Sequence, residues 1–205
     1  MIHIVTAENR EEFRSELLAM HRQRKAVFVD QMKWRLVCEE GLEIDEFDAE
    51  DVTYLLYLEG TELRASARML PTDRPHLLGS LFADLCEGEV PAGPSVWEST
   101  RFCPCPEVSE PRERRHLLGV MIAGMLEAGL LFGIEQITFV AGGALRPVAL
   151  AAGWDAHPLG PTVRRGRERL TACAATVSSE GLKRVREKHG LSYPLIRYAP
   201  MRDAA

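Results

Sequence analysis

The chain has 205 residues and a formal net charge of −5, with 46% hydrophobic and 27% charged residues, as in an ordinary soluble globular protein with a sizeable core. Its apolar runs are all well short of the ~20 residues that a membrane span needs. The N-terminal stretch MIHIVTAENREEF lacks the basic start and apolar centre of a secretory signal. We therefore expect a single domain, residues 1–205, with no membrane partner.

The first half of the chain predicts a strand, a long helix and a hairpin. Residues 2–6 alternate loosely and read as a strand, and apolar residues then recur at helical spacing from about residue 9 to residue 29. A charged loop follows to about residue 51. Strands over 52–58 and 63–69 are joined by a turn at EGT, and HLLGSLFADLC predicts a short helix after the break at PTDRP.

The second half alternates strands and helices. SVWESTRF, IEQITFV and RERLTACAATV read as strands, and residues 112–132 form the clearest helix. GALRPVALAAG is a helix with Pro147 in its first turn or at a kink, and SEGLKRVREKHG is a helix that stops at glycine. The order β-α-β-β-α-β-α-β-α-β-α predicts an α/β fold: a three-layer α-β-α sandwich around a mixed central sheet.

Cysteines and the distribution of charge limit the partners. Five cysteines without regular spacing include one C-x-C pair, Cys103 and Cys105, which is a weak metal signal, so we predict no metal and reduced thiols in the cytoplasm. Residues 143–205 carry 11 basic and 5 acidic groups, a local charge of +6. Such a patch can steer an anionic partner or can simply be solvated. Nucleic acid is not favoured, because no aromatic residues interleave with the arginines.

Several charged side chains fall where the apolar pattern predicts the interior. Arg24 lies on the apolar stripe of the first long helix, and Arg68 interrupts the strand-like segment ASARML. Glu98 and Arg101 lie inside WESTRF. An unpaired buried guanidinium is costly, so these arginines must find carboxylates or reach solvent. A group of this kind can be structural cross-bracing or part of a functional site.

An acidic run, LEIDEFDAED over residues 42–51, precedes the first hairpin strand. Asp45 and Asp48 are spaced three apart in it. If Ile44 and Phe47 point inward, the two aspartates lie at the edge of the core, within reach of arginines. The outer acidic residues are expected to face water: Glu39, Glu40, Glu46 and Glu50.

Six short features occur together in a fixed order: Arg24, Phe28 and Trp34, and then EIDEFD, RMLPT and ESTRF. This combination resembles the acyl-homoserine-lactone synthases, the autoinducer synthases of bacterial quorum sensing, over residues 1 to about 155. PHLLGSLFADL is also similar to a segment of that family, with Phe82 as the matching aromatic residue. The charged and aromatic signature of the family falls on residues that are all present here: Arg24, Phe28, Trp34, Asp45, Asp48, Arg68, Glu98 and Arg101.

The resemblance implies a fold similar to the GCN5-related N-acetyltransferases and an acyltransferase with two substrates. One substrate is S-adenosylmethionine, used as an amino-acid donor. The other is a fatty acyl group carried by acyl carrier protein or by coenzyme A. The products would be an acyl-homoserine lactone for quorum sensing, methylthioadenosine and the free thiol carrier, with no further cofactor.

The implied chemistry gives these residues roles. Acyl transfer needs a group that accepts the proton of the methionine amine, and Glu98 beside Arg101 is the candidate, with backbone N–H groups nearby to meet the oxyanion. Lactone closure mainly requires alignment of the methionine carboxylate, its γ carbon and the sulfonium. The predicted catalytic residues are Glu98, Arg101, Asp45, Asp48 and Arg68. The predicted S-adenosylmethionine-binding residues are Arg24, Phe28, Trp34 and Phe82, of which Phe28 and Trp34 suit stacking on adenine or proximity to the sulfonium, although they could also simply fill the core.

Two further sets of residues are assigned to the acyl donor. An apolar tunnel for the chain is predicted from Leu118, Met121, Met125, Ala141, Gly142 and Leu145, although core packing explains these positions equally well. Family members that favour a 3-oxo chain tend to carry Ser or Thr where this chain has Ala141, Gly142 and Gly143, so a 3-oxo preference is not expected. Basic surface for carrier-protein docking is predicted at Arg112, Arg114, Arg115, Arg146, Arg164 and Arg165.

Two other functions compete with this prediction. One is a GCN5-related acyl-CoA N-acyltransferase acting on another amine, but RERRHLLGVMIAG lacks the basic-x-x-Gly-x-Gly/Ala spacing of its pyrophosphate turn. The other is a non-catalytic acyl-carrier or lipid-binding regulator. Such a protein would have no reason to retain Glu98, both aspartates and the aromatic pair together.

Overall fold

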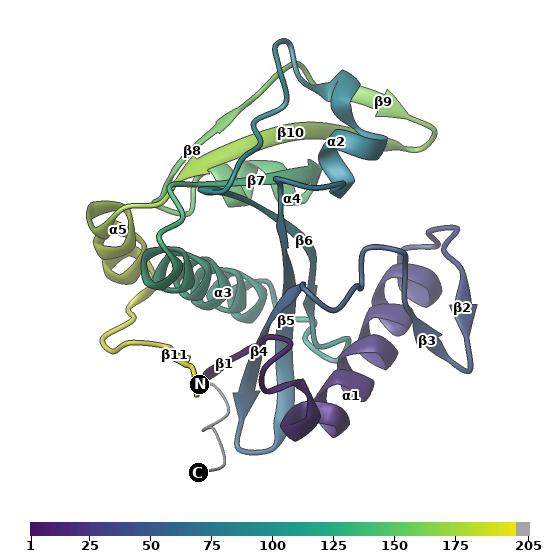
Figure 1. The fold of residues 1–205 in the computed structure, drawn as a ribbon, viewed down its shortest axis with the longest axis vertical. Helices are drawn as coiled ribbons and strands as arrows, with labels where there is room; N and C mark the ends of the chain where they lie inside the picture. The colour runs from purple at the N-terminus through teal and green to yellow at the C-terminus, as the bar shows by residue number, and fades with distance from the viewer. Residues whose placement is uncertain (200–205) are drawn as a thin grey trace.

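A nine-stranded mixed sheet with helices on both faces organises residues 1–199, which are the residues that the computed structural model describes (Figure 1). The strand order is β11-β1-β4-β5-β6-β7-β10-β8, with β9 paired to β10. Neighbours are antiparallel except for the parallel pairs β1–β11 and β6–β7. The strands of this sheet are β1 (Ile2–Val5), β4 (Thr53–Glu59), β5 (Glu62–Pro71), β6 (Val96–Pro104), β7 (Gln136–Gly142), β8 (Asp155–Pro158), β9 (Val163–Arg165), β10 (Glu168–Thr176) and β11 (Ile196–Arg197).

The helices follow the predicted order with refined bounds. They are α1 (Arg14–Arg24), α2 (Leu77–Leu81), α3 (Pro111–Phe132), α4 (Leu145–Leu150) and α5 (Ser179–His189). The predicted first long helix is composite, because a 3₁₀ turn (Arg10–Phe13) precedes α1 and a π-helix (Lys25–Gln31) continues it. Pro147 lies in the first turn of α4, one of the two places expected. The short strands β8, β9 and β11 were not predicted, nor was the separate hairpin of β2 (Cys38–Glu39) and β3 (Leu42–Glu43).

Alternation along the strands directs side chains to two different helical layers. Leu55 on β4 and Met69 on β5 pack in one cluster with Met121 of α3. Their neighbours Leu56 and Leu70 belong to another cluster, with Met20 of α1. The helices α1 and α3 therefore cover opposite faces of the sheet, and the predicted α-β-α sandwich is confirmed (Figure 1).

The helix α3 is the apolar centre of the molecule. It starts with proline at its first position and ends at Gly133, whose φ of +70° suits a glycine C-cap. Glycine lets it approach the sheet closely, since a Cβ at Gly124 would lie 2.3 Å from the Ile2 side chain. Within residues 1–199, α3 alone is long and apolar enough to span a membrane, but 72% of the relevant window is buried inside the protein. This is how a core helix behaves.

Two irregularities of β6 shape the region between β5 and β7. Across β5, Ser66 pairs with Cys103 but Arg68 pairs with Thr100, so β6 carries one extra residue, a β-bulge at residues 101–102. Arg101 has a φ of +51°, in the left-handed region that most side chains avoid. Within the described residues, the parallel pairing of β6 with β7 stops at Ser99 and Phe139, although both strands continue.

Candidate active site

The last residue of α1, Arg24, is fully buried and holds two carboxylates. Its Nε donates to Glu43 Oε2 at 2.5 Å, and its two terminal nitrogens donate to the two oxygens of Asp48 at 2.8 and 2.9 Å. Tyr54 also donates its hydroxyl to Asp48 at 2.8 Å. A bidentate guanidinium–carboxylate pair of this kind fixes the acidic run against the helix.

A second buried arginine, Arg68 on β5, completes the hold on the acidic run. Its Nη1 and Nη2 donate to Asp45 Oδ1 and Oδ2 at 2.5 and 3.1 Å. The Nη1 atom also lies 2.8 Å from Asp48 Oδ1. Its Nε donates to Thr100 Oγ1 on β6 at 2.9 Å. The predicted pairing of the two aspartates with Arg24 and Arg68 is thus present in the structure.

The third arginine is Arg101, in the bulge of β6. Its terminal nitrogen donates to Glu43 Oε1 at 3.0 Å and to Asp45 Oδ2 at 2.7 Å. Ser99, two residues earlier, bonds to Met125 of α3, so strict alternation would send Arg101 toward α3 as well. The bulge turns it to the α1 face. We call the resulting group the ion cluster; its members are Arg24, Glu43, Asp45, Asp48, Arg68 and Arg101.

Glu43 is a member of the cluster that the sequence analysis missed. It is fully buried and bonds to Arg24 and Arg101. Ile44 is 47% exposed, so of the two apolar residues considered for the interior, Ile44 and Phe47, it is the one that does not point inward. From β3 onward the chain is extended, so the side chains of residues 43 and 45 lie on one side and that of residue 44 on the other. The spacing of two between Glu43 and Asp45 in the sequence was therefore the signal that could have identified Glu43. Phe47 does pack inward, against the apolar cluster that contains Leu56 and Leu70.

The cluster is electrically balanced, with three guanidinium groups and three carboxylates. Burial alone would raise the pKa of Asp48, but the hydrogen bonds from Arg24 and the charges of Arg24 and Arg68 outweigh it and hold the pKa well below its ordinary value. Burial likewise opposes the charged form of Arg24, yet its bonds to Asp48 and Glu43 raise its pKa further. Asp48 and Arg24 therefore remain charged near neutral pH.

Glu98 on β6 lies in a different setting. It is 0% exposed, pairs across the sheet with Leu70 and Thr138, and accepts the backbone N–H of Leu78 at 3.0 and 3.1 Å. Burial raises its pKa to about 7, although the N–H groups of residues 77 and 78 and the charges of Arg68 and Arg101 oppose this shift. A carboxyl with such a pKa exchanges its proton near neutral pH.

An aromatic pair borders the ion cluster. Phe28 and Trp34 stack with their ring centroids 4.9 Å apart and their planes at 10°. The π-helical turn over Lys25–Gln31 places Phe28 there, and such turns are frequent at functional sites. The guanidinium of Arg101 lies 5.8 Å from the Phe28 centroid, so the aromatic pair adjoins the charges directly.

Other predicted site residues are distributed over separate clusters. Phe82 packs near Leu78 and Ala172, apart from the Phe28 cluster. Of the predicted tunnel residues, Leu118, Ala141 and Leu145 share one cluster, and Met121 and Met125 belong to the cluster on the other side of α3. Gly142 closes β7, near Glu168.

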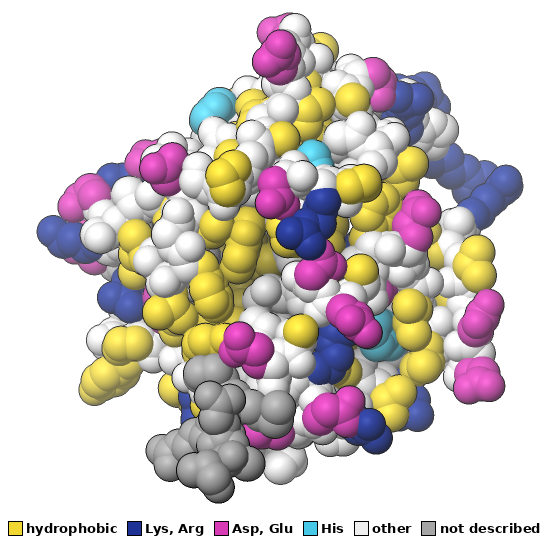
Figure 2. Space-filling view, in the orientation of Figure 1, with side chains coloured by type: hydrophobic (Ala, Val, Ile, Leu, Met, Phe, Trp, Pro, Cys, Tyr) yellow, Lys and Arg dark blue, Asp and Glu magenta, His cyan; other side chains and the backbone are white. Residues whose placement is uncertain are grey.

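The predicted basic docking residues lie mostly at the surface. Figure 2 shows Lys and Arg side chains gathered at the upper right, over the hairpin of β9 and β10. Arg164 and Arg165 are exposed there, and Arg165 pairs with Asp84 beyond α2. Arg146 is only half-exposed, on α4. At the start of α3 the predicted docking arginines, Arg112, Arg114 and Arg115, are not buried; Arg112 and Arg115 are exposed and Arg114 is half-exposed.

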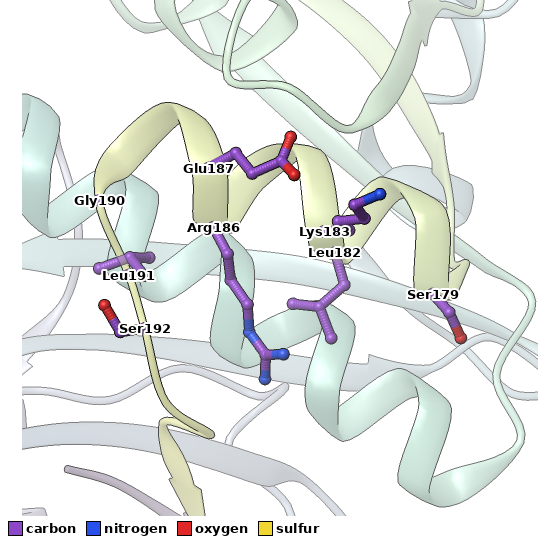
Figure 3. A pocket seen from close by; sticks show the side chains of 8 residues that line it. All are labelled: Ser179, Leu182, Lys183, Arg186, Glu187, Gly190, Leu191 and Ser192. Carbon is purple, nitrogen blue, oxygen red and sulfur yellow. The ribbon is translucent and has the colours of Figure 1, made fainter.

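A surface cavity of about 500 Å³ runs along α5 and the turn after it, but it shares no residue with the predicted site (Figure 3). Arg186 points from α5 toward α3 and pairs with Glu127 at 2.7 Å. The second oxygen of Glu127 accepts the N–H groups of Leu195 and Ile196. These contacts fasten the segment around β11 to α3, and we assign them a structural role.

The fold is shared with a protein described as an N-acetyltransferase. A putative N-acetyltransferase from Lactobacillus plantarum, 14% identical, superposes with a TM-score of 0.54 over 86% of this chain and 99% of its own, which shows a shared fold alone. The predicted likeness to N-acetyltransferases is confirmed.

More specific comparisons identify the family. The autoinducer synthase family model matches residues 8–185. An acyl-homoserine-lactone synthase of Rhizobium etli is 33% identical over 163 residues, which cover 78% of this chain and 76% of that protein. The solved CoA-dependent acyl-homoserine lactone synthase MesI is 32% identical, with a TM-score of 0.85 over 96% of this chain and 98% of its own. A second such enzyme, BjaI, solved with SAM and isopentyl-CoA, is 26% identical, with a TM-score of 0.88 over 98% and 94%.

The chain belongs to the autoinducer synthase family. The predicted family and the predicted acyltransferase activity in quorum-sensing signal synthesis are confirmed.

Proposed function

We propose that this protein transfers an acyl group from a thioester to the amine of S-adenosylmethionine and then closes the lactone, with Glu98 as the base. The observation that supports the assignment of Glu98 is that its buried carboxylate has no arginine or lysine partner in the described residues. Within residues 1–199 the buried glutamates are Glu43, Glu98 and Glu127; the other two pair with arginines, and Glu98 has no ion-pair partner.

The first step needs a neutral amine. S-adenosylmethionine carries an ammonium group at neutral pH, and a carboxylate with a pKa of about 7 accepts its proton at little cost. The amine nitrogen then attacks the thioester carbon, and the tetrahedral oxyanion collapses with cleavage of the carbon–sulfur bond. The released thiolate takes up the proton that the nitrogen loses as it becomes an amide. In the described residues the carboxylate oxygens of Glu98 bond only to backbone N–H groups at the start of α2, so they remain able to accept the proton.

The divergence of β6 from β7 suits the thioester. Beyond Ser99 and Phe139 the facing edges of the two strands no longer pair within the described residues, so their backbone groups can bond to a substrate. N–H groups on this part of β6 are our candidates for the oxyanion site, beside Glu98. The predicted tunnel residues on α3 lie beneath the same strands, and we retain them as candidates for the acyl chain.

The ion cluster frames the S-adenosylmethionine pocket in this proposal. Its carboxylates are already matched by arginines, so its main contribution is rigidity rather than free negative charge. Asp45, with 20% of its side chain exposed, is the most open member and the best placed to meet the cationic substrate. Phe28 and Trp34 would stack on the adenine or lie beside the sulfonium.

The acyl donor is a coenzyme A or carrier-protein thioester. The solved neighbours MesI and BjaI are described as CoA-dependent, which favours coenzyme A. The exposed arginines would serve either donor, because coenzyme A carries phosphates and a carrier protein carries carboxylates. We propose a cytoplasmic site of action, supported by five unpaired cysteines, and no cofactor besides the two substrates.

The test is product analysis with purified protein. S-adenosylmethionine is incubated with a panel of acyl-CoA and acyl-carrier thioesters, and methylthioadenosine and the lactone are quantified by mass spectrometry. Release of methylthioadenosine that depends on an acyl donor supports the synthase, and its rate identifies the donor. Free thiol without methylthioadenosine would indicate an N-acyltransferase for another amine, and the absence of both products would indicate a binding protein.

A further inference from the structure

The helix α2 begins directly over Glu98. It is only five residues long, Leu77–Leu81, and its preceding residue, His76, gives it no side-chain cap. The Glu98 carboxylate supplies the missing cap, because both of its oxygens accept the N–H of Leu78. The direction of this N–H, and so the environment of the carboxylate, depends on what holds the first turn of α2.

His76 is built into that turn. Its side chain is 6% exposed, and its Nδ1 donates to the carbonyl of Arg74 at 2.9 Å. Its own carbonyl accepts the N–H of Ser80 at 2.9 Å, which closes the first helical turn. The other ring nitrogen, Nε2, is buried and has no hydrogen-bond partner among residues 1–199. Hydrogen bonding therefore holds the ring only at Nδ1, and packing must hold its Nε2 edge.

The packing partner is Gly79, in the same turn. A Cβ placed at Gly79 would lie 2.9 Å from both Cε1 and Nε2 of His76, closer than ordinary contact, so the ring lies directly on the glycine. A glycine inside a short helix lowers its intrinsic stability. Its presence here is explained if the ring of His76 needs the space.

We propose that His76 is a positioning residue that, by seating its ring on Gly79, holds the first turn of α2 so that the N–H of Leu78 points at the Glu98 carboxylate. This inference rests on the proposed role of Glu98. The charged groups that act on Glu98 are Arg68 from β5 and Arg101 from β6, and neither changes when His76 is altered. Loss of the Leu78 hydrogen bonds removes a contact that favours the carboxylate form, so the carboxyl will hold its proton to higher pH.

Three variants test this: His76→Ala, which removes the ring; Gly79→Ala, which displaces it; and Ser80→Ala, a matched control at the next, exposed position of α2. The titration of Glu98 is followed by NMR in protein with ¹³C-labelled glutamate carboxyl groups, and its signal is assigned from its loss in Glu98→Gln. In parallel, kcat/KM for acyl transfer is measured from pH 5 to 9. These readouts do not follow from a general loss of stability.

We expect the Glu98 titration and the acidic limb of kcat/KM to move upward by about one pH unit in both His76→Ala and Gly79→Ala, a tenfold loss of kcat/KM at low pH, with no change in Ser80→Ala. Unchanged carboxyl titration in folded Gly79→Ala and His76→Ala would overturn the inference. If the NMR titration moves but the limb of kcat/KM does not, His76 positions Glu98 as inferred, and the proposed role of Glu98 as the base fails instead.

Discussion

Buried carboxylates on the α1 side of the sheet occupy two contrasting settings. In the ion cluster, each carboxylate contacts at least one guanidinium, and the pKa of Asp48 is held well below its ordinary value. Glu98, two residues before Thr100 and on the same face of β6, has only backbone N–H partners and a pKa raised to about 7. Asp48 is thus held in its charged form and serves as structure, whereas Glu98, without an ion-pair partner, can change its state during a reaction.

The largest effect expected from this contrast is on turnover. Glu98→Gln keeps the size of the side chain and an acceptor for Leu78, but removes the proton acceptor, so we expect kcat/KM to fall by about 10²–10⁴-fold. The free energy of unfolding at pH 7 should not decrease, because an unfavourable buried charge has been removed. Steady-state kinetics and urea unfolding of the same preparation measure both quantities.

A matched control is Glu127→Gln, which alters a buried glutamate that pairs with Arg186 and lies outside the site. It should lower stability and leave the turnover of folded protein unchanged. If Glu98→Gln instead lost as much stability as Glu127→Gln while keeping its turnover, Glu98 would be a structural brace and the contrast would collapse.

The next largest effect is on stability. Arg24→Met keeps much of the volume of the side chain but leaves the three carboxylates of the cluster with only two guanidinium groups, those of Arg68 and Arg101. Breaking a buried ion pair in this way costs about 3–5 kcal/mol of unfolding free energy. Urea titration should show this loss, whereas Arg14→Met, at an exposed arginine of the same helix, should change stability by less than about 0.5 kcal/mol. A stable, active Arg24→Met would remove Arg24 from the frame of the pocket.

The two settings should also respond to pH with opposite signs. The pKa of Glu98 is raised from 4.5 to about 7 on folding, so its contribution to stability is complete below pH 4.5 and is lost as pH rises through 7. The free energy of unfolding of Glu98→Gln, relative to that of the native protein, should therefore rise by about 3 kcal/mol between pH 4 and pH 8. A gap that stays constant with pH would show that the carboxyl has no raised pKa.

For Asp48 the sign is reversed. Its folded pKa lies below its ordinary value of 3.8, so its stabilising effect is present above pH 3.8 and is lost as pH falls. Asp48→Asn should thus be far less stable than the native protein at pH 7, with a deficit that shrinks below pH 4. A deficit that grew on acidification would contradict the pairing.

Much of the fold was accessible from the sequence because its elements carry local signals. The long apolar helix α3, the hairpin of β4 and β5 and the order of strands and helices follow from periodicity and turn residues. The short strands β9 and β11, of three and two residues, carry too few positions for a pattern to appear. They form because longer strands offer them a partner.

The site was predictable as a set of residues but not as a geometry. Charge within apolar segments indicated Arg24 and Arg68, since such residues need partners. Glu43 was missed because Ile44 beside it seemed to belong to the core. The orientation of Arg101 depends on the β-bulge, which arises from pairing with β5 and cannot be read from β6 alone.

The smallest expected effect concerns Arg101, because it belongs to the ion cluster and its charge also acts on Glu98. Its guanidinium bonds to Glu43 and Asp45, and its charge lowers the pKa of Glu98. Arg101→Gln removes that charge, so the acidic limb of kcat/KM should move upward by less than about half a pH unit, and Arg101→Lys, which keeps the charge, should leave it in place. Both variants lose the bidentate fork, so their common loss of stability cannot account for a difference between their pH profiles. A shift above one unit in Arg101→Gln would mean that Glu98 is tuned by the ion cluster rather than by burial, and the two settings would then be one electrostatic unit.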